Sequence, residues 1–291
     1  MNEVTEKRYA EKPYQLGGSF LIQMLFQAPV SLPEQAEMTA VLSRHIGAVE
    51  CVSHEENMAG FAALDHMAQF QDGSAPVQLL VTGFNDFRGE NFDTFLKSQM
   101  WDCLEDRERI LRECRYQVTA IDMLAGALPA RERANLDMDF LEALAELYPT
   151  CTAFYFQNCG KLFSAQQVHS NPLSGPDCFI RFGVNARYFT IQDTGEQVVD
   201  TLGMGTLYLP DLQYHFQGMD PNWVVNHAYN LASYLLQQDN PIRSGETVDG
   251  VVNGRISTRL QWKCQYEEAL IQPAREVLDV HMGEYAAGAR I

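Results

Sequence analysis

Arginine and asparagine side chains recur with the two-residue period of a β-strand in the second half of the sequence. The alternation predicts a strand over residues 179–192, and the polar face of this strand carries Arg181, Asn185 and Arg187. A guanidinium group binds carboxylates and phosphates through paired hydrogen bonds, so Arg187 could act as a bidentate clamp on an anion. This face is the first candidate for a ligand site.

Polar side chains from two further predicted elements extend this candidate. A strand over residues 212–217 carries His215, whose imidazole titrates near neutral pH. The helix expected after Asp220 carries Asn226 and Asn230 on one side, because residues four apart are neighbours on a helix surface. If these elements converge, the six side chains could bind an anionic or polar ligand.

A simpler interpretation explains the same residues without a ligand. Antiparallel sheets commonly have one face in water, so the polar strand faces would be solvated, and the amides would satisfy backbone groups in turns. Asp220 precedes Pro221 and suits the N-cap of a helix, where its carboxylate accepts hydrogen bonds from backbone N–H groups. We favour this interpretation over the ligand site.

Catalytic and cofactor-binding motifs are missing from the sequence. It contains no GxxxxGK[ST], GxGxxG or GxSxG pattern, so neither a phosphate-binding loop nor a nucleophile elbow is expected. The seven histidines are widely spaced, and the seven cysteines contain no CxxC pair. The sequence therefore predicts no catalytic residue, no metal and no cofactor, and favours a protein that is not an enzyme.

An excess of acidic side chains dominates the electrostatics of the chain. Lys and Arg total 21 against 38 Asp and Glu, which gives a formal net charge of −17. Such a charge repels phosphate backbones and anionic lipids, and no segment concentrates Lys and Arg. We therefore expect neither nucleic acid nor a membrane as a partner.

The sequence also lacks the features of an exported or membrane-spanning chain. Residues 1–18 are polar and mixed in charge, unlike the apolar core of a secretory signal. The most apolar stretch nearby, residues 20–30, contains Gln23 and Gln27 and is shorter than the roughly 20 residues that span a bilayer. Together with cysteines in no disulfide framework, these features predict a cytoplasmic protein.

Strand and helix patterns alternate in the first half of the chain. Apolar runs predict strands over residues 20–27, 48–52, 60–64, 77–84, 116–124 and 152–157. Apolar residues at helical spacing predict one helix that begins at Pro33, a long helix over residues 92–114 and another over residues 129–148. The Gln, Ser, Asn and Pro composition of residues 164–176 predicts a loop, and the boundary between two α+β parts, residues 1–168 and 169–291, is expected within it.

Further strands are expected in the second half over residues 197–202, 259–266 and 277–281, with a helix from Asp220 to about Gln238. The strands arrive in runs rather than in strict alternation with helices. This order favours an α+β fold with mixed or largely antiparallel sheets packed by helices, in two halves of similar size.

Several short motifs in the second half occur in an order typical of one family. They are FGVNARYFTI, DTLGM, LPDLQYHFQGMDPNWVVNHAYNLASYL, GETVDG and WKCQYEEAL, between Phe182 and Leu270. The C-terminal part of the chain resembles the bacterial family catalogued as domain of unknown function 4261. That resemblance implies no established activity, substrate or catalytic residue.

Two functional hypotheses follow from these observations. The first is a non-catalytic protein-interaction or regulatory module whose polar, acidic surface binds a protein partner. The second is an enzyme or small-anion-binding protein with a site around Arg181, Arg187 and His215. The lack of an assembled catalytic motif favours the first, and the oligomeric state stays open.

Overall fold

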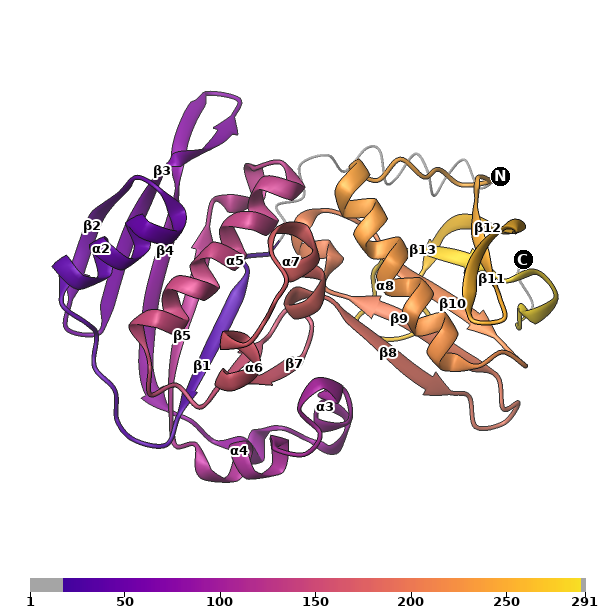
Figure 1. The fold of residues 1–291 in the computed structure, drawn as a ribbon, viewed down its shortest axis with the longest axis horizontal. Helices are drawn as coiled ribbons and strands as arrows, with labels where there is room; N and C mark the ends of the chain where they lie inside the picture. The colour runs from indigo at the N-terminus through magenta and orange to yellow at the C-terminus, as the bar shows by residue number, and fades with distance from the viewer. Residues whose placement is uncertain (1–17, 289–291) are drawn as a thin grey trace. The chain divides into compact units, whose positions relative to one another are not determined.

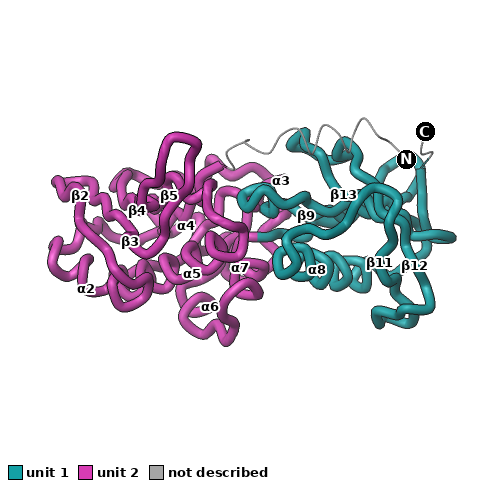
Figure 2. The backbone as a smooth tube through the Cα atoms, turned by 90° about the horizontal axis from the view of Figure 1, so that it is seen from above, with its two compact units in different colours: residues 1–16, 184–291 teal, residues 17–183 magenta. Residues whose placement is uncertain are grey.

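The protein, described here by a computed structural model over residues 18–288, divides into two compact units (Figure 2). Within that range, residues 18–183 are called the first unit here (unit 2, magenta, in Figure 2), and residues 184–288 are called the second unit (unit 1, teal, in Figure 2). Each unit combines helices with a sheet whose strands are largely antiparallel (Figure 1). The predicted α+β class is therefore confirmed.

The sheet of the first unit contains seven strands in the described residues. They are β1 (Leu21–Phe26), β2 (Val49–Glu55), β3 (Met58–Phe70), β4 (Gly73–Asp86), β5 (Tyr116–Met123), β6 (Ala153–Phe156) and β7 (Lys161–Ser164). Their order is β2-β3-β4-β5-β1-β6-β7, with antiparallel neighbours throughout. Strands were expected at six of these positions, whereas the four-residue β7 was not.

Helices cover both faces of this sheet. One face carries α2 (Gln35–Ile46), α5 (Ala130–Leu147), α6 (Ala165–His169) and α7 (Gly175–Gly183), and the other carries α3 (Thr94–Ser98) and α4 (Arg107–Glu113) (Figure 1). Adjacent residues of β1 face the two layers. The Phe26 ring contacts Tyr148 after α5, whereas Leu25 belongs to one apolar cluster with Leu111 of α4.

The prediction of one long helix over residues 92–114 is wrong. The segment forms α3, a 3-10 turn η2 (Trp101–Cys103) and α4. The Arg107 guanidinium donates to the Lys97 carbonyl at the end of α3 (2.7 Å), which satisfies a backbone group that a continuous helix would have used. Between the helices, the buried side chains of Met100 and Cys103 turn into the apolar cluster, so packing bends the chain there.

The prediction of a loop over residues 164–176 is also partly wrong, because this stretch contains α6. This helix begins at a capping box in which the Ser164 hydroxyl accepts from the Gln167 backbone N–H, while the Gln167 side chain accepts from the Ser164 backbone N–H. A capping box is a local sequence signal for a helix start. It lies here in a stretch whose composition favours a loop.

The strand predicted over residues 179–192 is shorter than expected, because α7 occupies its first part. A short apolar run fits a buried helix as well as a buried strand, and packing decides between them. The ring centroids of Phe179 and Phe20 are 5.5 Å apart, and those of Phe182 and Phe163 are 4.8 Å apart. Residues 169–183, assigned from the sequence to the C-terminal part, therefore pack within the first unit.

The sheet of the second unit contains six strands in the described residues. They are β8 (Asn185–Thr190), β9 (Gln197–Leu202), β10 (Asp211–Phe216), β11 (Thr247–Val252), β12 (Arg255–Glu268) and β13 (Glu276–His281). Their order is β11-β12-β13-β10-β9-β8, and β10 and β13 are the parallel pair. No strand was expected at the position of β11.

One long helix, α8 (Pro221–Gln238), packs on this sheet. Asp220 is its N-cap, as predicted, and its carboxylate accepts from the Asn222 backbone N–H at 2.9 Å. Neither α8 nor any other helix within residues 18–288 has the length and apolar character needed to cross a membrane.

Candidate functional site

The six side chains predicted to form a ligand site lie on four elements. Arg181 is in α7 of the first unit, whereas the others are in the second unit, with Asn185 and Arg187 on β8, His215 on β10, and Asn226 and Asn230 on α8. The prediction that Arg181 shares a strand face with Arg187 is therefore wrong. Its cause is the helix that replaces the first part of the predicted strand.

His215 projects from the face of the second sheet that α8 does not cover. The preceding Tyr214 points to α8, where its hydroxyl is 2.8 Å from His227, and successive strand residues point to opposite faces. The His215 Nε2 atom lies 2.9 Å from a Glu196 carboxylate oxygen. His215 thus already has an acidic partner within the second unit.

Arg187 lies on the same face and is buried, with 2% of its surface exposed. It pairs across the ladder with Asp200, which pairs with Gln213, two residues before His215. Its Nε and Nη2 atoms donate to the two Asp200 oxygens at 2.9 and 2.5 Å, and Nη1 donates to the Gln272 carbonyl at 2.9 Å. The paired hydrogen bonds expected for an external anion are therefore made to a carboxylate of the protein itself.

A second arginine completes this buried cluster. Arg275 donates to Asp200 at 2.8 Å and to Asp211 at 3.0 Å, so two guanidinium groups face two carboxylates. Burial raises the pKa of Asp211 to about 6, although the charge of Arg275 opposes this shift. The cluster joins β8, β9 and β10 to the segment between β12 and β13, and its charges pair with one another.

The remaining candidates have different surroundings. The Arg181 guanidinium lies over the Phe163 and Phe182 rings, 5.9 and 5.6 Å from their centroids, within the first unit. Asn226 and Asn230 are exposed on α8, and the Asn230 amide donates to the Asn226 carbonyl at 2.7 Å. These two asparagines leave part of their polar surface available to a ligand.

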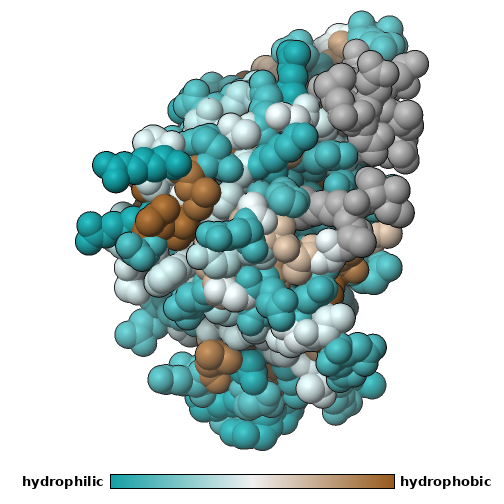
Figure 3. Space-filling view, turned by 90° about the vertical axis from the view of Figure 1, so that its right-hand side faces the viewer, coloured by the Kyte–Doolittle hydropathy of each residue, from teal (hydrophilic) through white to brown (hydrophobic). Residues whose placement is uncertain are grey.

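A groove runs between α8 and the hairpin formed by β11 and β12. Its volume is about 370 Å³. Helix α8 contributes Asn230, Leu231 and Tyr234 to its walls, and the hairpin contributes Val248 and Ile256. Tyr234 and Ile256 are 47% and 50% exposed, so the groove presents apolar surface to solvent. Figure 3 shows hydrophobic side chains gathered in small patches among hydrophilic ones on one side of the molecule.

His227 lies at the base of this groove and is 3% exposed. Its Nε2 atom is 2.7 Å from the Asp249 carbonyl, which can only accept, so Nε2 carries the proton. Burial lowers the pKa of His227, and in the neutral ring Nδ1 then accepts from the Tyr214 hydroxyl. The ring also packs on Trp262, with centroids 4.9 Å apart. These contacts fix α8 against the sheet.

Strand β11 forms one edge of the second sheet and pairs with β12. In an antiparallel ladder, every second residue turns its N–H and C=O groups away from the neighbouring strand. The Asp249 carbonyl points to His227, whereas the Glu246 carbonyl accepts from the Cys264 N–H of β12. By this alternation, Thr247 and Asp249 turn backbone groups away from β12, beside the groove, and of these the Asp249 carbonyl is already bound to His227.

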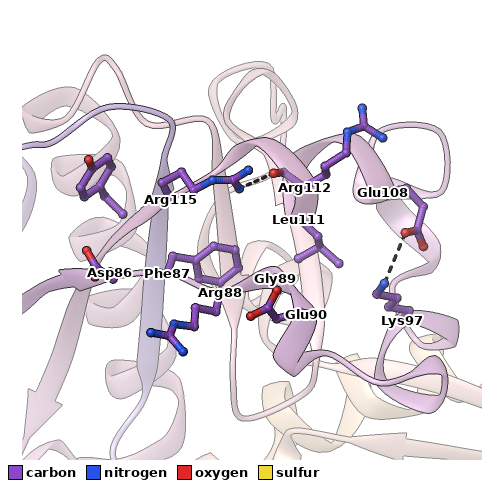
Figure 4. A pocket seen from close by; sticks show the side chains of 11 residues that line it. Asp86, Phe87, Arg88, Gly89, Glu90, Lys97, Glu108, Leu111, Arg112 and Arg115 are labelled. Carbon is purple, nitrogen blue, oxygen red and sulfur yellow. Dashed lines mark hydrogen bonds and ion pairs between the residues drawn. The ribbon is translucent and has the colours of Figure 1, made fainter.

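A larger, charged cleft of about 660 Å³ lies beside α4 in the first unit (Figure 4). Arg88, Arg112 and Arg115 line it together with the ion pair between Lys97 and Glu108, whose atoms are 3.4 Å apart. Figure 4 shows Arg115 reaching the backbone of Arg112 rather than a carboxylate. Charged groups of both signs therefore line the cleft.

A buried ion cluster in the first unit has a structural role. The Arg133 guanidinium donates to Asp122 at 2.8 Å and to the Gly18 carbonyl at 2.8 Å, which connects α5 to β5 and to the start of the described chain. Asp137 is fully buried one helical turn further on, and burial raises its pKa well above the ordinary value. Each of these contacts joins elements of the fold, which explains the cluster without a ligand.

Metal ligation finds no support in residues 18–288, where no three His, Cys, Asp or Glu side chains are grouped as ligands. The groove beside β11 is the candidate site that combines apolar walls with an edge strand. Sequence reasoning missed it because its two walls are far apart in the chain, and because β11 is short and contains Gly250. The available signals were the GETVDG motif and the position of His227 within α8.

Comparisons with known proteins bear on this same part of the chain. Neither the curated proteins nor the solved structures provide a significant match. One family model matches residues 200–281, a range that includes α8, β11 and most of the second sheet. The C-terminal part of the chain is therefore similar to the family described as a domain of unknown function, DUF4261.

Proposed function

We propose that this protein is a non-catalytic protein-interaction module that binds an extended segment of a partner protein along β11. The observation that carries the proposal is the edge strand beside a helix-walled groove in the second unit. An extended peptide can add to such an edge through backbone hydrogen bonds, while neighbouring pockets select its side chains.

The contacts expected in the complex follow from the geometry of β11. Thr247 would exchange backbone hydrogen bonds with the added strand. Asp249 would donate its backbone N–H to that strand, because its carbonyl already accepts from His227. Alternate side chains of that strand would enter the groove against Leu231, Tyr234 and Ile256, which favours apolar residues at every second position. The groove volume of about 370 Å³ lies within the usual range for ligand pockets.

Charge and cysteine chemistry support the proposed class of partner and place of action. A net charge of −17 disfavours nucleic acid and anionic lipid and favours a protein. Cys103, Cys114, Cys151, Cys159, Cys178 and Cys264 are buried free thiols, which suits the reducing cytoplasm. A role as a regulatory module in the cytoplasm is consistent with these features.

The alternative, an enzyme or small-anion-binding protein with a site around Arg181, Arg187 and His215, has less support. Arg187 and His215 each contact a carboxylate of the second unit. An incoming anion would have to displace those carboxylates, and a buried carboxylate without its partner is costly.

Peptide selection tests the proposed function. A library of short random peptides displayed on phage would be selected against the whole chain, and enriched peptides would be titrated by fluorescence anisotropy. We expect sequences with apolar residues at alternate positions. Thr247→Pro, which removes a backbone donor on the edge, and Tyr234→Ser should each weaken binding by about tenfold or more.

Leu270→Ser provides the matched control, because Leu270 is 55% exposed in the same unit and does not line the groove. This variant should bind like the parent chain. The proposal fails if no peptide is enriched, or if Thr247→Pro and Tyr234→Ser bind as tightly as Leu270→Ser. Circular dichroism of each variant would establish that the fold is retained.

A further inference from the structure

Four large apolar side chains are exposed within one short segment of the first unit. They are Phe95, Leu96, Trp101 and Leu104, with exposed fractions of 47, 36, 42 and 54%. The segment includes α3 and η2 and lies between β4 and β5 in the chain, where one long helix was expected. Exposed apolar groups that cluster in this way commonly mark an interaction surface.

The base of this segment is fixed by packing. Met100 and Cys103, between the exposed residues, are 0% and 4% exposed and belong to the apolar cluster under α4. The Arg107 guanidinium donates to the Lys97 carbonyl at 2.7 Å. The exposed side chains therefore project from an ordered support, so binding a partner would not require this segment to lose conformational entropy by folding.

Acidic residues outnumber basic ones over residues 90–105, which contain four carboxylates and one lysine, and this lysine and the two arginines that follow are paired. Lys97 and Arg107 lie 3.4 and 3.5 Å from Glu108. Arg109 lies 2.7 Å from Asp106.

By contrast, Glu90, Asp93 and Glu105 are exposed and form no ion pair with any residue that the structure describes. Asp93 is the N-cap of α3, and its carboxylate accepts from the Leu96 backbone N–H at 2.8 Å, so Glu90 and Glu105 are the two carboxylates that remain available along the segment. The surface is apolar with an acidic rim.

We propose that residues 90–105 form a second docking surface, which binds a basic amphipathic segment of a partner protein. The partner's apolar side would cover Leu96, Trp101 and Leu104, and its Lys or Arg side chains would meet the acidic rim. Charge complementarity selects this occupant. A second copy of this chain would bring the same carboxylates, and an anionic membrane would be repelled, so both are disfavoured.

This surface is independent of the groove beside β11, because it lies in the other unit. The two sites together would make the chain an adaptor that contacts two segments of one partner or two different partners.

Titration with designed helical peptides tests the second surface. The probes are an amphipathic peptide of lysine and leucine and its counterpart of glutamate and leucine. Trp101 reports binding through a blue shift of its fluorescence as solvent is excluded. We expect the lysine peptide to bind and the glutamate peptide not to bind. Leu96→Ser/Leu104→Ser should weaken binding by about tenfold or more, and Glu105→Lys should weaken it and reduce its dependence on salt.

The double variant Leu64→Ser/Leu173→Ser is the matched control, because these leucines are 42% and 38% exposed elsewhere in the first unit. It should bind the lysine peptide like the parent chain. The proposal is overturned if neither peptide binds, if the glutamate peptide binds equally well, or if both double variants bind alike. Binding to phosphatidylserine vesicles, or a dimer that Leu96→Ser/Leu104→Ser disrupts, would also reject the proposed occupant.

Discussion

Arg187 illustrates how a residue suited to anion binding can serve the fold instead. Its guanidinium is buried and makes paired hydrogen bonds to Asp200. Replacing Arg187 with Ala would leave the Asp200 charge buried beside Arg275 alone. We expect Arg187→Ala to lower the free energy of unfolding by about 3–5 kcal/mol, measured by urea denaturation. Arg255→Ala, an exposed control in the same unit, should change it by less than about 0.5 kcal/mol. A small effect of Arg187→Ala would instead favour a functional role for this residue.

His227 should make the stability of the second unit depend on pH. Burial lowers its pKa in the folded state, so between that value and the ordinary pKa of about 6.5 the unfolded chain binds more protons. Stability from this residue is complete above about pH 6.5 and is lost as the pH falls. Protonation also gives Nδ1 a hydrogen, which conflicts with the hydrogen bond from the Tyr214 hydroxyl.

Asp211 has the opposite pH dependence, because a folded pKa raised to about 6 favours the folded state as the pH falls. The effect of His227 must therefore be read from a difference. We expect the unfolding free energy of the parent chain, minus that of His227→Phe, to decrease between about pH 7 and pH 5. Urea titrations at a series of pH values would measure it. A difference that does not change with pH would show that His227 is not held neutral by the fold.

Among the elements, α8 was predicted from the local signal at its start, whereas the capping box at the start of α6 lay in a stretch predicted as a loop. Asp220 and Pro221 define the start of α8 through an N-cap and a suitable first position, and these effects need no tertiary contact. The apolar spacing of residues 92–114 also suggests a helix. There, burial of Met100 and Cys103 in the cluster shared with β1 and β6 breaks it, and this packing cannot be read along the chain.

A close backbone approach gives a prediction for the same region. An added Cβ at Gly89, in the 3-10 turn η1 (Gly89–Asn91), would lie 1.9 Å from the Leu111 carbonyl oxygen of α4. Backbone on both sides must then move apart. We expect Gly89→Ala to destabilise the first unit by about 1–3 kcal/mol in urea denaturation. Gly18→Ala is the control, since nothing lies within 4 Å of an added Cβ there. Equal stability of the two variants would mean that η1 separates from α4 at little cost.

At the scale of the whole molecule, the candidate site shows the limits of reasoning from strand faces. Asn185 and Arg187 do share β8, and His215 projects from the same sheet face. Their partners, Asp200, Glu196 and the carbonyl of Gln272, come from other segments and could not be assigned from spacing. The groove beside β11 was missed for the same reason, because the contact between His227 and Asp249 joins residues that no local pattern links.

The division into two units predicts how the molecule responds to damage in one of them. The buried arginine cluster lies wholly in the second unit, and the ion cluster of Arg133 lies wholly in the first. If each unit folds around its own core, Arg187→Ala should increase amide hydrogen exchange in residues 184–288 and leave residues 18–183 protected, as measured by mass spectrometry at moderate urea. Gly89→Ala should give the reverse pattern and serves as the matched control. Loss of protection in both units from either single substitution would mean that they unfold as one cooperative structure, and that predicted parts of the chain are not independent domains.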